Sequence, residues 1–180
     1  IAKVVSEIIE TGIQSSLQLI PVVVNDASVD NTAQIIDQLN CVALHLPVNL
    51  GIGGAVQTGI KYAHANNFDF AVQVDGDGQH PPKFIPLLLK DLQERKLDVI
   101  IGSRFLNKEG FQSSTMRRTG IKYFRVLNKF LIGITIHDST SGFRLMNKNA
   151  LSVLSEVYPD EYPEPEAIVI YKKFNLKAYF

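Results

Sequence analysis

Residues 70–82 read Phe-Ala-Val-Gln-Val-Asp-Gly-Asp-Gly-Gln-His-Pro-Pro, and this stretch predicts both a fold class and a site. The run Phe70 to Val74 is apolar apart from one glutamine, which is typical of a buried strand. Asp75 and Asp77 follow it, and two carboxylates at this spacing can converge on one hard cation. The glycines beside them let the backbone bend closely toward a ligand. The stretch therefore predicts a strand-end site for Mg²⁺ or Mn²⁺, held together with the oxygens of a diphosphate.

A calcium-binding loop is excluded by the residues that follow the aspartate pair. An EF-hand loop that began at Asp75 would need glycine at its sixth position and glutamate at its twelfth. Those positions hold His80 and Pro86. A polar turn whose aspartates cap the next helix, which begins near Pro81-Pro82, remains open as a purely structural alternative.

The composition indicates one globular domain that spans residues 1–180. The chain has 180 residues, 46% of them hydrophobic, which is enough for a substantial core. Its 18 basic and 18 acidic residues balance, so no charge excess favours nucleic acid as a partner. The single cysteine, Cys41, excludes an internal disulfide and a thiolate metal cluster and is expected to be a buried small hydrophobe. No apolar run reaches the ~20 residues that span a bilayer, and no signal peptide is apparent, so we expect a cytoplasmic location.

Strand-like and helix-like segments alternate along the chain. This alternation is typical of βαβ units in an α/β fold, here a Rossmann-like, three-layer arrangement in which helices flank a mostly parallel sheet. The predicted strands are residues 20–24, 42–46, 70–74, 98–101, 143–146 and 176–180. The predicted helices are residues 2–10, 28–39, 54–66, 82–95, 116–132, 148–157 and 167–174, with a rigid proline-rich loop over 158–165.

The pattern opens on a helix, residues 2–10, rather than on a strand. In a doubly wound sheet the first strand is usually central and lines the ligand crevice. We therefore expect a further strand upstream of Ile1, which makes the chain truncated at its N-terminus. The strand at 176–180 looks cut off, so we expect truncation at the C-terminus as well.

The segment Asn25 to Thr32 follows the predicted strand 20–24, at the carboxyl end where α/β proteins bind ligands. Ser28 is suited to cap the following helix, and Asp30 favours the positive end of that helix. Asp26 precedes the cap and is available to accept hydrogen bonds from a nucleobase. Helix capping alone and nucleotide binding both remain open for this segment.

The glycine-rich segment Asn49 to Gly54 resembles a phosphate-binding loop only in part. Val56 stands where the dinucleotide fingerprint requires glycine, and Ile60 follows Gly59 where a P-loop requires lysine. A tight turn that packs closely onto a helix start is therefore the favoured interpretation.

Three arginines have two interpretations each. Arg144 ends the hydrogen-bonding segment Asp138 to Arg144 and is either a structural ion-pair partner or a clamp for a phosphate group. Arg117 and Arg118 either lie on a solvated helix face or bind phosphate.

Two glutamates near a predicted helix start are equally open. Glu164 and Glu166 flank Pro165 and either favour the helix dipole or include a general base. The four histidines lack the spacing of zinc ligands, so no metal role is assigned to any of them.

Five segments in this order resemble the family 2 glycosyltransferases of the GT-A fold, and especially the branch that transfers sugars to polyprenyl phosphates. Each segment alone is a weak motif, whereas their order over nearly the whole chain is specific. The segments are Asn25 to Thr32, Asn49-Leu50-Gly51, Asp75 to Pro82, Ile101-Gly102-Ser103-Arg104-Phe105 and Ser141-Gly142-Phe143-Arg144.

The resemblance implies a role for individual residues. Asp26 would contact the nucleotide base, and Asp75 and Asp77 would be the DxD pair that holds Mg²⁺ or Mn²⁺ against the donor diphosphate. Gln79 matches a further position beside the metal. Arg118 roughly matches a basic residue that receives phosphate groups. Glu166 or, failing it, Glu164 falls at the position of an acidic base that accepts a proton. One element departs from the family, since the strand that normally precedes a helix like residues 2–10 is absent.

The implied activity is the inverting transfer of a sugar from a nucleoside diphosphate sugar. A hydroxyl acceptor would need a carboxylate base such as Glu166, whereas a lipid phosphate is already ionised and needs positive charge nearby. Arg117, Arg118 and the Asp75–Pro82 signature favour polyprenyl phosphate. This acceptor implies cell-envelope or surface glycan synthesis and peripheral contact with the inner face of the cell membrane. The alternatives are a saccharide hydroxyl as acceptor, a nucleotidyltransferase, or a degenerate nucleotide-binding domain.

Overall fold

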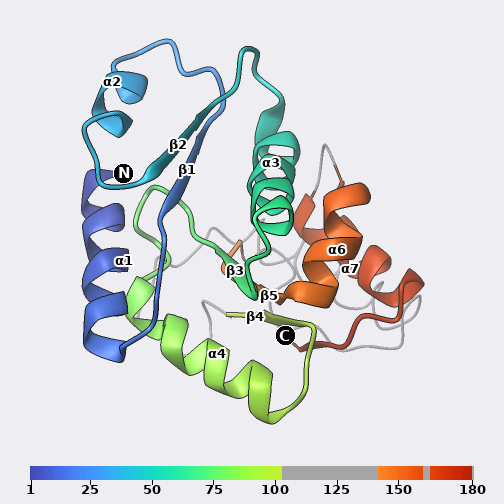
Figure 1. Ribbon diagram of the computed structural model, residues 1–180. Helices are drawn as coiled ribbons and strands as arrows, with labels where there is room; N and C mark the ends of the chain where they lie inside the picture. Colours follow the sequence, from blue (N-terminus) through green and yellow to red (C-terminus); the bar gives the residue numbers. More distant parts are fainter. Residues whose placement is uncertain (103–141, 160–162, 180) are drawn as a thin grey trace, which may run out of the picture.

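The computed structural model describes residues 1–102, 142–159 and 163–179, in which helices and strands alternate (Figure 1). The helices are α1 (Ala2–Ser15), α2 (Thr32–Ile36), α3 (Gly51–Ala65), the 3₁₀ helix η1 (Pro82–Phe84), α4 (Ile85–Glu94), α6 (Lys148–Glu156) and α7 (Pro163–Lys173). The strands are β1 (Val22–Asn25), β2 (Val42–His45), β3 (Phe70–Gln73), β4 (Val99–Ile101), β5 (Arg144–Asn147) and β6 (Ala178–Tyr179). The predicted helix 116–132 lies outside the described residues.

The strands form two sheets. In the first, β1 and β2 pair in parallel, with Val22 opposite Val42 and Asn25 opposite His45. The second has the strand order β3-β5-β4-β6, in which β5 runs antiparallel to both neighbours and β6 runs parallel to β4. The expectation of a mostly parallel sheet is thus wrong for β5. Hydrophobic alternation predicts that a strand exists but carries no information on its direction, and residues 103–141 separate β5 from β4.

Several element boundaries differ from the sequence prediction; the helix expected over 2–10, for example, runs on to Ser15. The helix expected over 28–39 is only α2, because Gln38 and Leu39 donate i to i−3 bonds to the carbonyls of Ile35 and Ile36 and leave the α-helical pattern. The helix expected to start at Gly54 begins at Gly51. The loop expected over 158–165 gives way to α7 at Pro163, a position where a missing backbone N–H costs nothing.

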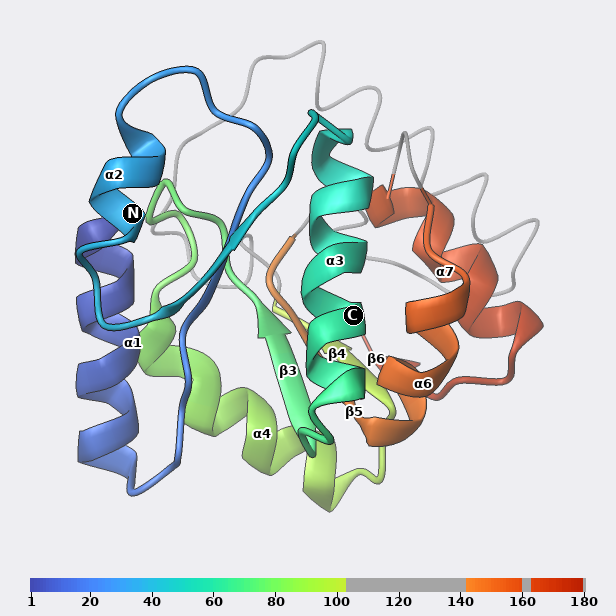
Figure 2. The same ribbon diagram turned by 45° about the horizontal axis from the view of Figure 1, so that its top comes forward.

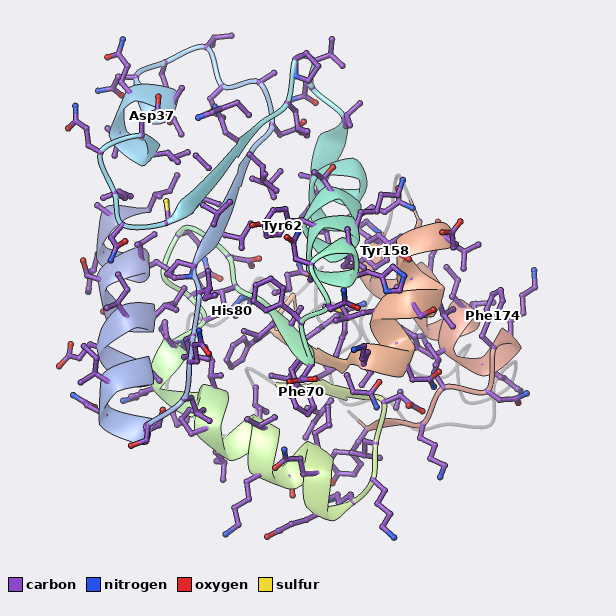
Figure 3. All side chains as sticks on the ribbon, in the orientation of Figure 1. Asp37, Tyr62, Phe70, His80, Tyr158 and Phe174 are labelled. Carbon is purple, nitrogen blue, oxygen red and sulfur yellow. The ribbon has the colours of Figure 1, made fainter. Side chains whose placement is uncertain are left out.

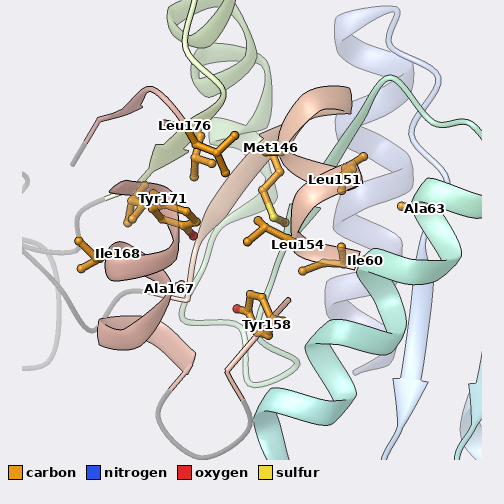
Figure 4. Close-up of a cluster of buried hydrophobic side chains, with 13 residues drawn as sticks. Ile60, Ala63, Met146, Leu151, Leu154, Tyr158, Ala167, Ile168, Tyr171 and Leu176 are labelled. Atoms are coloured by element: carbon orange, nitrogen blue, oxygen red, sulfur yellow. The ribbon is translucent and has the colours of Figure 1, made fainter. Parts of the chain in front are cut away.

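Apolar side chains pack on both faces of the larger sheet. On one face α3, α6 and α7 close over a cluster that includes Ile60, Met146, Leu154 and Tyr171 (Figure 4). On the other face α4 contributes Ile85 and Leu92, which pack with Leu145 in a second cluster. Met146 and Leu145 are neighbours in β5 and point to opposite faces, as the period of two requires. The three-layer α/β architecture is therefore confirmed.

A cavity of about 520 Å³ separates the two sheets. Its lining is mostly apolar and comes from α1, β1, α3 and β3, with Val4, Val24 and Val72 among the residues that face it. Within the described residues β1 pairs only with β2, and β3 pairs only with β5. Each of the two strands therefore presents an unpaired edge toward this cavity.

Candidate active site at the strand ends

Several chain segments that the sequence predicts to bind ligands gather at one edge of the molecule. Figure 2 shows that β1, β2 and β3 all end on the same side, where α3 begins. The carboxyl ends of strands in an open α/β sheet form the usual ligand crevice. The N-terminus of α3 adds a positive helix dipole to this edge.

The Asp75–His80 turn is stabilised by its own hydrogen bonds. The Asp75 backbone N–H donates to His80 Nδ1 at 3.2 Å, and the Gln79 N–H donates to Asp77 Oδ1 at 2.9 Å. Gly78 has φ +81°, a conformation that side chains rarely adopt, so glycine suits this position. The turn folds back so that its last residue lies under its first.

His80 is the buried residue beneath this turn (Figure 3). Its side chain is 1% exposed, and its ring stacks on Phe143 with a centroid distance of 5.3 Å and an interplanar angle of 15°. A backbone N–H can only donate, so Nδ1 accepts from Asp75 and the ring proton lies on Nε2. In this tautomer the 3.4 Å contact from Nδ1 to Asp75 Oδ2 joins two acceptors and is not an ion pair. The backbone bond decides the tautomer because its donor cannot change role.

Gly142 brings a distant segment against the first aspartate. A Cβ atom at position 142 would lie 3.0 Å from both Asp75 Oδ1 and Gln73 Nε2, which is tighter than nearly all real Cβ contacts. The backbone at residue 142 therefore lies directly beside the Asp75 carboxylate. The sequence segments around Asp75 and Ser141 to Arg144 meet at this point.

The Asp75–His80 turn carries side chains whose chemistry fits a hard divalent cation. The Asp75 side chain is 36% exposed, and Asp77 and Gln79 are both exposed. Two carboxylates and an amide oxygen are the donors that Mg²⁺ and Mn²⁺ prefer. In the ranges that the structure describes, no three His, Cys, Asp or Glu side chains cluster as a complete ligand set. Two carboxylates and one amide oxygen would leave further positions of such a cation to oxygens from outside the described protein groups.

Asp26 ties the end of β1 to the start of α3. Its Oδ1 accepts from the Leu50 N–H at 2.6 Å, and its carbonyl accepts from Asn49 Nδ2 at 3.3 Å. Asn49 Oδ1 in turn accepts from the Gly51 N–H at 3.0 Å, so the Asn49-Leu50-Gly51 motif forms the turn that enters α3. In the described part of the chain nothing donates to Asp26 Oδ2, which points to an available acceptor.

The expected cap of the helix after β1 is wrong in its residue. Ser28 does not cap α2; its N–H donates to Asn25 Oδ1 at 3.1 Å instead. Asp30 Oδ1 accepts from the Thr32 N–H at 2.9 Å, and hydrogen bonding to the Thr32 side chain and then to this N–H holds the pKa of Asp30 below its ordinary value. Asp30 thus serves the first turn of α2, as the sequence predicted, while Asp26 serves the entry to α3.

Arg144 is buried within the larger sheet. It is 1% exposed, lies in β5 opposite Gln73 of β3, and donates from Nη1 to the Tyr171 hydroxyl at 3.2 Å. Its guanidinium therefore connects β5 to α7, and the sequence interpretation as a phosphate clamp stays a prediction.

The remaining predicted residues are not joined to the Asp75–His80 turn by any described contact. Glu166 is exposed in the first turn of α7, and no hydrogen bond or ion pair among the described residues links it to Asp75 or Asp77. Glu164 also lies in α7, but its side chain is outside the described part, as are Arg117 and Arg118. Their assigned roles stay predictions.

The three-layer α/β domain with carboxylates at its strand ends has the GT-A fold. The crystal structure of S. aureus TarS 1-349 has the same fold, with a TM-score of 0.52 and 21% identity over 88% of this chain and 47% of that one. Residues 4–154 match glycosyl transferase family 2. The chain therefore belongs to glycosyl transferase family 2.

Similar proteins carry names from one branch of sugar transfer. The chain is 31% identical to a UDP-N-acetylglucosamine–dolichyl-phosphate N-acetylglucosaminyltransferase of Methanococcus voltae, over 86% of this chain and 70% of that protein. It is 29% identical to a polyprenol monophosphomannose synthase of Mycolicibacterium smegmatis, over 72% and 51%. It is also 29% identical to an undecaprenyl-phosphate mannosyltransferase of Micrococcus luteus, over 73% and 56%.

The chain thus spans between about half and 70% of the length of these relatives. Of the helices that the structure describes, none has the length and apolar character to cross a membrane.

Sequence reasoning missed two residues at this edge. His80 was set aside because it lacks zinc spacing, yet it lies buried under Asp75. His45 was set aside for the same reason, yet it bonds the last residue of β1. A histidine three residues after a strand-end carboxylate pair is the signal that pointed to His80.

Proposed function

We propose that this chain is the catalytic domain of an inverting enzyme that transfers a sugar from a nucleoside diphosphate sugar to polyprenyl phosphate. One observation carries the proposal. The turn after β3 presents the exposed side chains of Asp77 and Gln79, and the half-exposed carboxylate of Asp75, at the edge where Asp26 keeps an available oxygen. The names of the similar proteins support polyprenyl phosphate as the acceptor class.

The donor would be held from both of its ends. Asp26 Oδ2 is proposed to accept from an N–H of the base, while Asp75, Asp77 and Gln79 are proposed to hold Mg²⁺ or Mn²⁺ against the diphosphate. When bound, the cation neutralises charge that develops on the leaving diphosphate. Gly142 leaves no side chain beside Asp75, so the donor can approach that carboxylate closely.

The chemical step is one displacement at the anomeric carbon. An oxygen of the acceptor phosphate attacks C1 from the face opposite the leaving group. The new C1–O bond forms as the bond to the donor diphosphate breaks, which releases the nucleoside diphosphate and inverts the anomeric centre. The acceptor is already ionised near neutral pH, so no proton has to be removed. Arg118, outside the described residues, is proposed to receive the acceptor phosphate.

Product analysis tests this reaction against its alternatives. The protein is incubated with Mn²⁺, a short-chain polyprenyl phosphate and either UDP-N-acetylglucosamine or GDP-mannose, and products are identified by mass spectrometry. We expect a polyprenyl-phosphate sugar and free nucleoside diphosphate. Release of pyrophosphate would instead indicate a nucleotidyltransferase, and a saccharide product only with added glycan would indicate a hydroxyl acceptor.

The Asp77→Ala variant tests the site itself. We expect transfer to fall by about 10²–10³-fold, because a charge-stabilising ligand is lost. The unfolding midpoint should change only slightly, since Asp77 is exposed and accepts one hydrogen bond within its own turn. Asp69→Ala is the matched control, since Asp69 is exposed and directly precedes β3 at the opposite end of that strand. Full activity of Asp77→Ala, or of the wild type in metal-free buffer, would contradict the assignment.

A further inference from the structure

A chain of side-chain hydrogen bonds runs behind the proposed base-binding residue. Asn25 ends β1 and His45 ends β2, and the two residues are partners in the parallel pairing. Asn25 Nδ2 and His45 Nδ1 lie 3.0 Å apart, and His45 Nε2 lies 2.9 Å from Asp37 Oδ1. Asn25 Oδ1 also accepts from the Ser28 N–H at 3.1 Å. Figure 3 shows Asp37 beside α2, at the outer end of this chain of bonds.

Both ends of this chain of bonds have fixed chemical roles. The Asp37 carboxylate can only accept, so His45 Nε2 carries a proton and donates it. The Ser28 backbone N–H can only donate, so the side-chain oxygen Oδ1 of Asn25 faces Ser28 and the side-chain NH₂ of Asn25 faces His45. His45 Nδ1 must therefore accept. Every bond has one direction, and the neutral Nε2–H tautomer of His45 satisfies all of them.

These bonds hold a turn that the backbone alone does not favour. Asn25 is 6% exposed, and its backbone carbonyl accepts from the N–H groups of Ala27 and Leu46 at 3.0 and 2.9 Å. Ala27 has φ +53°, in the left-handed region that residues with a Cβ atom rarely occupy. Asp26 lies between Asn25 and Ala27. Its position is therefore set by the Asn25 side chain on one side and by Asn49 and Leu50 on the other.

We propose that His45, held by Asp37, is a positioning residue for nucleotide binding. It fixes the orientation of the Asn25 amide, Asn25 holds the 25–28 turn, and the turn presents Asp26 to the base. His45 itself does not contact the donor or the reacting atoms. The proposal rests on the proposed function, because it assumes that Asp26 binds the nucleotide.

The test compares nucleotide affinity among variants that break or keep these bonds. The His45→Phe variant removes both ring hydrogen bonds, whereas His45→Gln keeps one acceptor and one donor on a planar group. His64→Phe is the matched control, because His64 is an exposed histidine in the last turn of α3. Dissociation constants for UDP and for GDP are measured by calorimetry in excess Mn²⁺.

We expect His45→Phe to weaken binding of the preferred nucleotide by about tenfold, the scale of one or two lost hydrogen bonds. His45→Gln should recover most of that affinity, and His64→Phe should match the wild type. In transfer assays the loss of affinity should raise the KM for the donor, and kcat should change by less than about twofold, because His45 acts on binding and not on the chemical step. Asp37→Ala removes the hydrogen bond at the exposed outer end and should also weaken nucleotide binding. This variant replaces His45→Phe in the test if His45→Phe folds poorly.

The contrary outcomes separate this proposal from the proposed function. If the wild type binds nucleotide and His45→Phe binds it equally well, the positioning role is wrong while the proposed function stands. Equal losses in His45→Gln and His45→Phe would also overturn the role, since the Gln variant keeps the bonding groups. If the wild type binds neither UDP nor GDP, the proposed function fails and the positioning role fails with it. Ring ¹⁵N shifts give a last check, because a proton on Nδ1 of His45 at neutral pH would contradict the bond directions.

Discussion

At the scale of single residues, the site depends on groups that are not themselves ligands. His80 fills the space under the Asp75–His80 turn and satisfies the Asp75 N–H, while Gly142 lies beside the Asp75 carboxylate because it has no side chain. Both residues act on the same aspartate from different directions. Asp77, in contrast, is positioned within its own turn by the Gln79 N–H.

Replacement of His80 should lower stability and loosen the Asp75–His80 turn. His80→Leu leaves the Asp75 N–H without its acceptor and removes a buried stacked ring, so we expect a loss of about 1–3 kcal/mol in the free energy of unfolding, measured by urea denaturation. The same change at exposed His64 should cost under about 0.5 kcal/mol. Equal effects at the two positions would contradict the role assigned to His80.

A methyl group at position 142 should disturb the proposed metal site with little effect on the fold. Gly142→Ala places Cβ about 3.0 Å from Asp75 Oδ1, so the carboxylate has to move and affinity for Mn²⁺ and donor should fall. Gly59→Ala is the control, since its Cβ would meet Val24 only at an ordinary 3.6 Å within helix α3. That control should gain roughly 0.5–1 kcal/mol of stability and keep its Mn²⁺ affinity. Titration calorimetry with MnCl₂ and thermal unfolding measure both effects, and unchanged Mn²⁺ affinity in Gly142→Ala would contradict the geometry.

At the scale of elements, β4, β5 and β6 are joined at one carboxylate. Asp98 directly precedes β4, and its oxygens accept from the Lys177 N–H at 2.8 Å and from the side-chain amides of Asn147 and Asn149 at 3.0 Å each. Partial burial raises the pKa of Asp98, but these hydrogen bonds outweigh it and hold the pKa below its ordinary value. The strand that ends the described chain is therefore anchored by a charged group as well as by its own short ladder.

Acid should remove the stability that Asp98 contributes. Because its pKa is lower in the folded state, the contribution is complete above the pKa of the unfolded chain and is lost as pH falls through the folded value. We expect Asp98→Asn to lower the urea midpoint at pH 7 and to approach the wild type near pH 3. The exposed Asp69→Asn variant should follow the wild type at both pH values. A difference between Asp98→Asn and wild type that grew on acidification would contradict this sign.

At the scale of the whole molecule, the position of Glu166 bears on whether the acceptor is a phosphate or a hydroxyl group. Helix α7 packs on the core together with α3 and α6 (Figure 1). Glu166 lies on the exposed side of α7, and no contact among the described residues joins Glu166 to the turn after β3. If, as proposed, the acceptor is an ionised phosphate, no general base is required, and Glu166 has no proton to accept.

Glu166→Gln should therefore leave transfer to polyprenyl phosphate nearly intact. We expect kcat to change by less than about threefold, because a general base is usually worth ~10²–10⁴-fold and none is required here. Initial rates with saturating donor measure the effect, and Glu156→Gln, at an exposed position in the last turn of α6, is the control. A loss of several orders in kcat at unchanged donor affinity would indicate a hydroxyl acceptor instead.

The sequence by itself determined the class of fold, most strand positions and the strand-end location of Asp26, Asp75 and Asp77. These features follow from local periodicity and from residue types at the ends of apolar runs, which depend on near neighbours only. The apolar cavity between β1 and β3, at edges of these strands that have no partner among the described residues, was seen only in the structure.

Only the tertiary structure decided what surrounds those aspartates. The antiparallel pairing of β5 with β3 and the approach of Gly142 to Asp75 join residues about 70 apart in sequence. The bonds from Asp37 through His45 to Asn25 join three separate elements. The residues of the Asp75–Pro82 stretch predict a ligand site. The surroundings of its first carboxylate, Asp75, come from the buried ring of His80 and from the backbone of Gly142. Periodicity records which face of an element is buried, and it carries no record of which element will cover that face.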